Sequence, residues 1–313
     1  MENNLALAAA ACRAAVAPED FAEQVPLAPL CTFHAGGPAA YLITPDGAEQ
    51  LAEVLKICSE YRVPVEILGR GSNFLFADAG FPGIVIGMRK HFGGLAADPE
   101  TGMLMAGAGV TLSAAAQLAL SASLSGLEFA AGIPGTIGGG IRMNAGAYGG
   151  EMKQVLFEVT AMDRTGVLHE IPAEECGLSY RHSVFADNGW VILACRLHLT
   201  PGSPADIRAC MDDLNGRRRA KQPLEYASAG STFRRPEGHF AGQLIEEAGL
   251  KGYTVGGARV SEKHAGFVIS DGSATASDIL AVIRHVQAEV YRTSGVRLEL
   301  EVCLAGDFDA DNA

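Results

Sequence analysis

The stretch Gly132-Ile133-Pro134-Gly135-Thr136-Ile137-Gly138-Gly139-Gly140 decides the fold of this chain, together with a second glycine-rich turn, Gly69-Arg70-Gly71-Ser72-Asn73. Residues 143–149, Met-Asn-Ala-Gly-Ala-Tyr-Gly, close the longer stretch. Glycine allows a positive φ and a close approach of the backbone, so successive N–H groups can converge on an anion. Two such turns predict one large ligand whose pyrophosphate is bound by the main chain.

These turns do not match the common nucleotide-binding motifs. The chain has no G-x-x-x-x-G-K-[ST] phosphate loop. Gly69-Arg70-Gly71 follows an apolar run at 63–68, but Phe74-Leu75-Phe76 after it is typical of a strand or loop and not of a helix start. An ordinary Rossmann site is therefore disfavoured, and tight turns between strands are the competing structural interpretation.

Composition and charge limit the partners. The chain has 313 residues, of which 48% are hydrophobic and 19% charged, which is ordinary globular usage and enough for two or three modules. A formal net charge of -12 and a pI near 5.1 argue against nucleic acid or an anionic membrane. Small-molecule substrates are expected, and no obligate protein partner is evident.

The remaining composition points to a cytoplasmic protein. Seven cysteines without a CxxC motif indicate reduced thiols in a reducing compartment. The apolar N-terminal run at 1–11 lacks the basic region of a signal peptide, and no stretch reaches the roughly 18 uncharged apolar residues of a membrane span. The eight histidines show no H-x-x-x-H or H-E-x-x-H spacing, so no metal site is expected.

Helices and strands alternate without a strict βα rhythm, which predicts the α+β class. Helices are expected at 48–61, 111–125, from 204 onward, at 240–248 and at 277–291, and β-like runs at 63–68, 83–88, 103–108, 155–162 and 190–199. A break at 200–204, where Ser203 and Pro204 are typical of a helix start, predicts a boundary. The expected parts are 1–67, 68–200 and 201–313, and it is left open whether the last residues return to the earlier part.

Five blocks of sequence occur in the same order as in the flavin-dependent UDP-N-acetylenolpyruvoylglucosamine reductase family. They are Leu30 to Ala39; Leu68 to Asn73 with Ile133 to Tyr148; Leu178-Ser179-Tyr180-Arg181-His182-Ser183; Ala229-Gly230-Ser231-Thr232-Phe233-Arg234-Arg235-Pro236; and Ala258 to Phe267, leading to Leu298-Glu299-Leu300-Glu301-Val302. Together they span most of residues 30 to 305. The chain resembles the shorter type of this family, which lacks a substrate-covering insertion.

The resemblance implies an α+β fold like the FAD-binding fold of vanillyl-alcohol oxidase and p-cresol methylhydroxylase. Two subdomains, 1–67 and 68–200, would hold a non-covalent FAD, and a C-terminal α+β domain, 201–313, would bind the substrate. The FAD pyrophosphate would contact backbone N–H groups and hydroxyls of Gly69, Gly71, Ser72, Asn73, Gly135, Thr136, Gly138 and Gly139. Arg234, Lys263 and His264 would be contacts to the substrate diphosphate or structural residues.

The resemblance also implies the reaction, the NADP-linked reduction of UDP-N-acetylglucosamine enolpyruvate to UDP-N-acetylmuramate in peptidoglycan precursor and cell-wall biogenesis. NADPH would reduce FAD, and N5 of the reduced flavin would deliver hydride to the enolpyruvyl carbon distal to the carboxylate. By motif position, Ser231 resembles the proton donor, and Arg181 and Glu301 resemble the pair that stabilises the enolate-like intermediate.

Each role has a structural alternative. Ser231 beside Gly230 could be a turn-capping hydroxyl, and Arg181 a surface ion-pair partner, although its planar guanidinium can bind two carboxylate oxygens. In an expected strand at 296–302, Glu299 and Glu301 share one face, and only the family pattern favours Glu301. The basic run at 217–219, with Lys221, is interpreted as a solvated helix end, although part of it could attract the nucleotide diphosphate.

Two departures from the family pattern and two other functions stay open. His34 stands where arginine is common, and Arg234 where lysine is usual. An oxidase on the same fold would transfer electrons to oxygen and leave Ser231, Arg181 and Glu301 without a purpose. A non-catalytic relative would keep the fold as a binding or scaffold module and would be colourless when purified.

Overall fold

The computed structural model describes residues 2–308. The chain forms two compact units, each built from three separate segments. The first unit comprises Met1–Glu23, Tyr41–Arg70 and Gly83–Arg218, and the second comprises Gln24–Ala40, Gly71–Pro82 and Arg219–Ala313. The three-part division at residues 67 and 200 stays a prediction, and these two units have other bounds.

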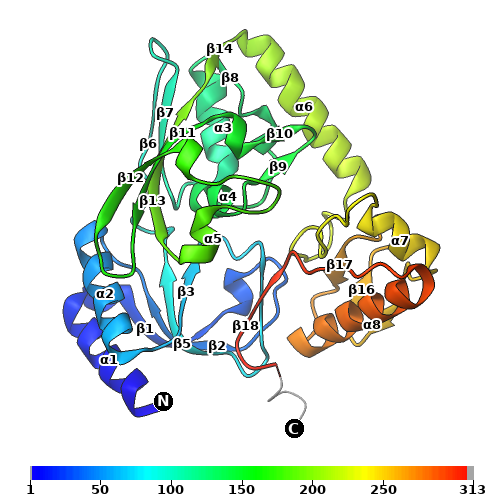
Figure 1. Ribbon diagram of the computed structural model, residues 1–313, viewed down its shortest axis with the longest axis horizontal. Helices are drawn as coiled ribbons and strands as arrows, with labels where there is room; N and C mark the ends of the chain where they lie inside the picture. Colours follow the sequence, from blue (N-terminus) through cyan, green and yellow to red (C-terminus); the bar gives the residue numbers. More distant parts are fainter. Residues whose placement is uncertain (1, 309–313) are drawn as a thin grey trace. The chain divides into compact units, whose positions relative to one another are not determined.

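Helices and strands are mixed throughout, which confirms the α+β class (Figure 1). The helices are α1 Glu2–Ala15, α2 Ala48–Tyr61, α3 Leu112–Ser121, α4 Ile137–Arg142, α5 Val184–Asn188, α6 Pro204–Lys221, α7 Ala241–Glu247 and α8 Ala276–Ser294. The strands are β1 Phe21–Pro26, β2 Pro38–Ile43, β3 Val65–Leu68, β4 Phe74–Phe76, β5 Phe81–Gly87, β6 Leu95–Asp98, β7 Met103–Gly107, β8 Leu124–Ser125, β9 Gly146–Ala147, β10 Gly150–Glu151, β11 Leu156–Met162, β12 Leu168–Pro172, β13 Val191–His198, β14 Thr200–Pro201, β15 Thr254–Val255, β16 Ala258–Val260, β17 Val268–Ser270 and β18 Cys303–Ala305. Within residues 2–308, no helix combines the length and apolar character that crossing a membrane requires.

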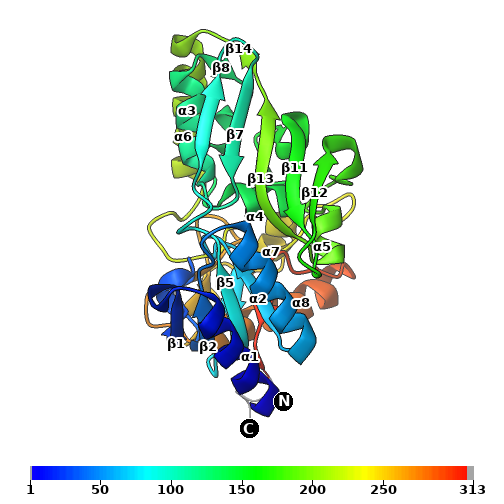
Figure 2. The same ribbon diagram turned by 90° about the vertical axis from the view of Figure 1, so that its left-hand side faces the viewer.

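An antiparallel sheet of five strands, in the order β12-β11-β13-β7-β6, forms much of the first unit (Figure 2). Its register aligns Val159 with Cys195 and Cys195 with Ala106. All three side chains are buried, because α3 and α4 contact this sheet. Strand alternation thus turns one face of the sheet into the core beneath the glycine-rich segment.

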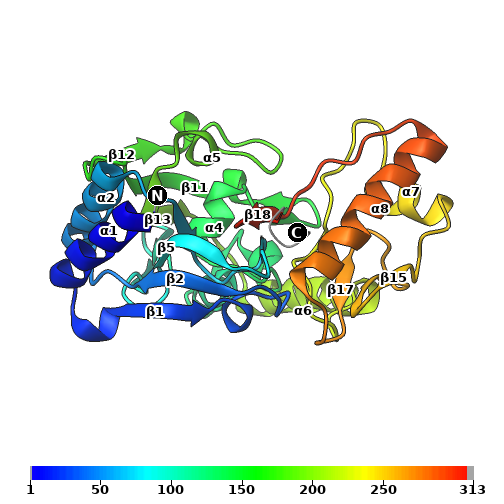
Figure 3. The same cartoon turned by 90° about the horizontal axis from the view of Figure 1, so that it is seen from below.

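A smaller sheet has the strand order β1-β2-β5-β3. Strand β3 pairs in parallel with β5, with Val65 opposite Ile84. Helix α2 has the bounds expected from its periodicity, and it buries Leu51, Val54 and Leu55 in the same hydrophobic core as Ile84. Figure 3 shows α1 and α2 together on one side of these strands.

Asp20 is a buried carboxylate in the first unit, with only 5% of its surface exposed. It accepts hydrogen bonds from Lys90 Nζ at 2.5 Å, from Thr44 Oγ1 at 2.7 Å and, when that ring nitrogen is protonated, from His91 Nε2 at 3.0 Å. Burial alone would raise the pKa of Asp20, but these partners outweigh it and hold the pKa well below the usual range. The ionised carboxylate thus joins the turn after β5 to the start of β1.

We expect Asp20→Asn to lower the free energy of unfolding by about 1 to 3 kcal/mol at pH 7, because Lys90 and His91 lose their carboxylate. Because the pKa of Asp20 is lower in the folded state than in the unfolded state, the ionised carboxylate stabilises the fold fully at any pH above the unfolded pKa of about 3.9. This stabilisation is lost as the pH falls through the folded-state pKa. The difference from wild type should therefore shrink below about pH 4. Urea denaturation at pH 7 and pH 3 checks this, and an identical difference at both would contradict it.

The second unit contains the three-stranded sheet β15-β16-β17, against which α8 packs. Ile279, Ile283 and Val286 of α8 are buried, as the helical periodicity predicts. Asp78 accepts the N–H groups of Ala276 at 2.7 Å and Ser277 at 2.8 Å, in the first turn of α8. A carboxylate from the segment Gly71–Pro82 thereby fixes a helix about 200 residues later in the chain.

Two expected elements differ in the structure. The helix predicted at 111–125 ends at Ser121, because Ser123 adopts a left-handed φ of 58° and Leu124–Ser125 pairs with β14. The strand predicted at 296–302 is wrong. Between α8 and β18, Leu300 alone makes a bridge, to Phe233, and the regular strand is β18, which pairs in parallel with β4.

Candidate functional site

Gly69 and Thr136, which come from the two different glycine-rich turns, touch within the first unit. A Cβ added to Gly69 would lie 2.4 Å from Thr136 Oγ1, so only glycine fits there. The longer turn is held in place by bonds from Leu112 N to Gly135 O at 3.1 Å and from Ile137 N to Val110 O at 2.8 Å. The first unit therefore brings two of its sequence-predicted cofactor contacts together.

The longer glycine-rich stretch is partly helical, and not the turn expected throughout 132–140. Buried Ile137 and Ile141, one helical turn apart, anchor α4 to the core. The N–H of Gly138 donates to Ala108 O at 3.0 Å, and a Cβ on Gly138 would lie 2.9 Å from that of Ala108. The N–H of Gly138 is thus bonded within the chain and Gly138 serves close packing, while its contact to a pyrophosphate stays a prediction.

Gly139 has the opposite surroundings. It is exposed, and the nearest atom that an added Cβ would meet is Thr136 Oγ1 at 3.7 Å. Glycine at an exposed helical position costs about 0.5 to 1 kcal/mol relative to alanine. No contact within the described polypeptide explains that cost. A ligand that approached the backbone beside Thr136 would account for this glycine.

The shorter turn uses its second glycine for packing within the second unit. Gly71 has a φ of 63°, and its added Cβ would lie 2.3 Å from Leu30 O. The N–H of Thr32 donates to Gly71 O at 3.2 Å, which places Thr32 beside the turn. The Thr32 hydroxyl oxygen is buried without a hydrogen-bond partner among the described residues. Sequence reasoning missed Thr32 as a contact, although it stands in the first family block.

The segments that carry Ser231 and Glu301 lie side by side in the second unit. Phe233 bridges Leu300, Arg234 N donates to Glu299 O at 2.9 Å, and Glu301 N donates to Thr232 O at 2.9 Å. Glu299 is exposed whereas Glu301 is half-buried, which supports Glu301 as the glutamate that faces a site. Main-chain hydrogen bonds thus hold together two segments, 232–234 and 299–301, that lie about 70 positions apart in the chain.

Arg181, in the first unit, stands at the tip of a tight turn. Ser179 and His182 exchange main-chain hydrogen bonds of 3.1 and 3.2 Å across this turn. Arg181 has a left-handed φ of 53°, and its guanidinium lies 5.2 Å from the centre of the Tyr180 ring. A non-glycine residue with this φ is strained, and such strain is concentrated at functional sites.

We expect Arg181→Gly to be more stable than Arg181→Ala by about 1 kcal/mol, because only glycine accepts the left-handed φ without strain. Both variants lose the guanidinium, so the comparison separates the backbone from the charge. Thermal and urea unfolding of the two purified variants provide the measurement. An alanine variant at least as stable as the glycine variant would show that the turn is not strained.

Asn144, which is 1% exposed, links the longer glycine-rich segment to the Arg181 turn. Its Nδ2 donates to Ser179 O at 3.0 Å and to Glu151 Oε2 at 3.0 Å, and its Oδ1 accepts the N–H of Lys153 at 2.9 Å. The full set of partners fixes this amide in one orientation. Its place within 143–149 was the only sequence signal for this role.

Arg218 corrects the interpretation of the basic run at 217–219. It is 8% exposed, its guanidinium donates to Gly132 O, and it bonds to Tyr148. Burial lowers the pKa of Arg218, and the tyrosine opposes that change. Arg218 therefore ties both ends of the glycine-rich segment to α6, whereas its neighbour Arg217 is exposed and pairs with Asp213 at 2.8 Å.

The three predicted substrate contacts lie in the second unit, in different surroundings. Lys263 Nζ donates to Arg219 O at 2.8 Å. His264 Nδ1 accepts the N–H of Gly266 at 3.1 Å, and burial lowers the pKa of His264. Arg234 is half-buried, and its Nε is buried without a partner in the described chain. Of the three, Arg234 has the donor that a bound anion would satisfy.

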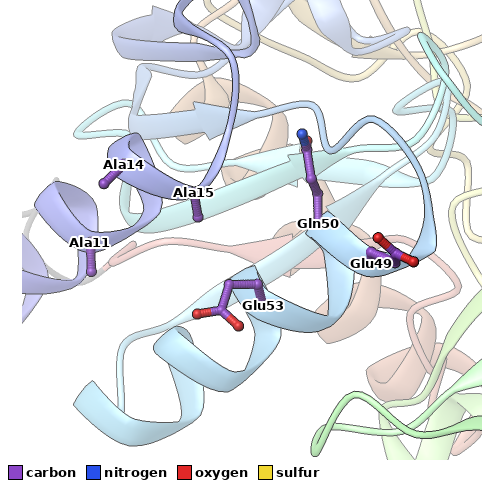
Figure 4. A pocket seen from close by; sticks show the side chains of 6 residues that line it. All are labelled: Ala11, Ala14, Ala15, Glu49, Gln50 and Glu53. Carbon is purple, nitrogen blue, oxygen red and sulfur yellow. The ribbon is translucent and has the colours of Figure 1, made fainter.

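A shallow depression between α1 and α2 is not this site (Figure 4). It has a volume of about 400 Å³ and is lined by Ala11, Ala14, Ala15, Glu49, Gln50 and Glu53. Two carboxylates and no basic side chain make it unsuitable for a phosphate-bearing ligand. In residues 2–308, no group of three or more His, Cys, Asp or Glu side chains could hold a metal ion.

Comparison with known families agrees with this arrangement. A FAD binding domain model matches residues 39–172, and a model of the UDP-N-acetylenolpyruvoylglucosamine reductase C-terminal domain matches residues 222–305. The fold and the glycine-lined site therefore define a flavoprotein oxidoreductase, and the predicted FAD-binding fold is confirmed.

Proteins similar to this chain narrow the class of flavoprotein oxidoreductases to one family. A UDP-N-acetylenolpyruvoylglucosamine reductase of Agathobacter rectalis is 47% identical, with 88% of this chain and 91% of the relative covered. One from Clostridium perfringens is 46% identical over 92% and 94%. The crystal structure of the Thermus caldophilus reductase has a TM-score of 0.78 at 36% identity, covering 90% of this chain and 98% of that one. The chain belongs to the UDP-N-acetylenolpyruvoylglucosamine reductase family.

Proposed function

We propose that this protein reduces UDP-N-acetylglucosamine enolpyruvate to UDP-N-acetylmuramate, with non-covalent FAD as cofactor and NADPH as reductant, in cytoplasmic peptidoglycan precursor synthesis. The observation that carries the proposal is the pairing of the Ser231 and Glu301 segments by main-chain hydrogen bonds. This pairing of the two segments supports the proposal, because protonation of a reduced enol ether needs a proton donor close to the charged group that assists it.

The residues present fit FAD. In the first unit, Gly69 touches Thr136, and Gly139 leaves open space beside the same threonine, a cradle that a Cβ would fill. In the second unit, the N–H of Thr32 bonds to Gly71 O, and the Thr32 hydroxyl is buried without a partner among the described residues. When bound, FAD supplies the hydride chemistry. The chain's own residues bind it through glycine-lined backbone and hydroxyl groups.

Ser231 is the proposed proton donor. Its hydroxyl bonds to no described residue in this structure, which argues against the turn-capping alternative. The left-handed φ of 77° at Gly230 directs the chain into the bridge with residues 299–301. A free hydroxyl that solvent can reprotonate suits donation to a strongly basic carbon.

Each charged residue has a proposed role of its own in binding the substrate or stabilising the intermediate. Arg181 would bind the enolpyruvyl carboxylate and stabilise the charge that develops beside it, since its guanidinium presents two parallel donors. Glu301 would act with it on the enolate-like state and hold the solvent that reprotonates Ser231. Arg234 would bind the substrate diphosphate through its unpaired Nε, and Lys263 and His264 would shape the adjoining loop.

The product identifies the reaction. Purified protein incubated with FAD, NADPH and UDP-N-acetylglucosamine enolpyruvate should yield a nucleotide sugar heavier by two hydrogen atoms, detected by mass spectrometry. In deuterated water, at least one of these two should be deuterium, because the proton comes through an exchangeable hydroxyl. An unchanged substrate with NADPH consumed would contradict the proposal.

A further inference from the structure

Asn73, which closes the shorter glycine-rich turn, is bonded to the chain around Glu301. Its side-chain Nδ2 donates to Glu301 O at 2.9 Å and approaches Cys303 Sγ at 3.7 Å. The N–H of Cys303 returns a bond to Asn73 O at 2.8 Å. The donors of the carboxamide are therefore directed at the C-terminal segment, although the sequence predicted this residue as a contact to FAD.

Both peptide groups of Glu301 are consequently held. Its N–H donates to Thr232 O at 2.9 Å, and its C=O accepts from Asn73 at 2.9 Å. Thr232 is itself fixed, because it is fully buried and its Oγ1 accepts the N–H of Val268 at 3.0 Å. Ser231 immediately precedes Thr232. The bond from Asn73 thus completes a main-chain clamp on Glu301, whose other bond is to the residue after Ser231.

Asn73 also bonds to the C-terminal segment at the point where that segment changes its pairing partner. On one side of Glu301 the chain bridges residues 232–234, and on the other side β18 pairs with β4, with Cys303 opposite Phe74. Glu301 lies between these two pairings, outside either ladder. Without the Asn73 side chain, the carbonyl group of Glu301 would lose this hydrogen bond, and the peptide group that follows Glu301 would be freer to rotate.

We propose that Asn73 is a positioning residue that orients Glu301 toward Ser231, and that its side chain serves the reduction of the enolpyruvyl substrate and not the binding of FAD. This inference rests on the proposed function. A misplacement of about 1 Å at a reacting group can cost about 100-fold in rate. Asn73 therefore acts on the rate of substrate reduction through Glu301.

The test compares Asn73→Ala with Ser72→Ala, its neighbour in the same turn. Asn73→Ala should keep the Kd for FAD within about threefold and the Kd for substrate unchanged, and should slow anaerobic reoxidation by the substrate about 10- to 100-fold. Ser72→Ala, at a predicted contact to FAD, should instead weaken FAD binding. Weaker FAD binding by Asn73→Ala with normal reoxidation would overturn the proposal.

A double-mutant cycle shows whether Asn73 acts through Glu301. Adding Asn73→Ala to Glu301→Gln should cost nothing further, because the clamped group is already removed. Multiplicative losses would overturn the proposal. Hydrogen exchange supplies a readout independent of activity, since the amides of 300–303 should exchange faster in Asn73→Ala, and unchanged exchange would also overturn it. Wild-type protein that the substrate fails to reoxidise would instead refute the proposed function.

Discussion

Ser231→Ala slows the reoxidation of reduced flavin by the enolpyruvyl substrate about 10²- to 10⁴-fold, the range that a lost proton donor commonly costs. Flavin reduction by NADPH stays near the wild-type rate, because that half-reaction needs no proton from the protein. The structure supports this division, since the Ser231 hydroxyl bonds to no described residue and its loss breaks no structural contact there. Anaerobic stopped-flow absorbance measures the two half-reactions separately.

Two controls make the Ser231 result specific. Ser231→Cys keeps a proton donor of similar size and should retain more activity than the alanine variant. Ser273→Ala removes a serine whose hydroxyl bonds to Asp271 in a surface turn, and should leave both half-reactions unchanged. Reoxidation of Ser231→Ala at the wild-type rate would remove Ser231 from the mechanism.

Gly139→Val yields flavin-poor protein. Its side chain would enter the open space beside Thr136, where the proposed cofactor approaches the backbone. We expect the Kd for FAD to rise about 100-fold, equivalent to about 2.7 kcal/mol. Titration with FAD, followed by absorbance and fluorescence, measures this change.

The stability of the flavin-free protein separates a blocked site from a damaged fold. An added Cβ at Gly139 meets no atom closer than 3.7 Å, so flavin-free Gly139→Ala should be as stable as wild type or slightly more stable. Gly138→Ala should be less stable, because its Cβ would lie 2.9 Å from that of Ala108. A fully yellow Gly139→Val protein would contradict the cofactor placement.

The sequence predicted those features that local periodicity controls. Helix α2 and the buried faces of α2 and α8 follow directly from apolar spacing, and α3 begins next to Thr111, where the expected helix begins. The two glycine-rich turns were expected to share one site, and the structure brings Gly69 and Thr136 into contact, while the anion itself stays a prediction. Local chemistry was sufficient for these features, because each depends on residues close in the sequence or on a required lack of a side chain.

The features that sequence reasoning missed depend on contacts between distant segments. Arg218 belongs to a charge run, and only the fold shows that it is buried beneath Gly132 and Tyr148. The strand expected at 296–302 is displaced to 303–305, because the available partner strand is β4. Likewise, the bond from Asn73 to Glu301 joins residues 228 positions apart, a pairing that no spacing rule predicts.

The central claim is tested most directly by the visible spectrum of the FAD-loaded protein under anaerobic conditions, reduced with NADPH and then mixed with UDP-N-acetylglucosamine enolpyruvate. The account predicts that NADPH bleaches the flavin bands and that the substrate restores them without oxygen. Bleaching that persists until air is admitted would contradict the reductase function and favour an oxidase or another acceptor. A protein that shows no flavin bands even after FAD is added would contradict the cofactor site itself.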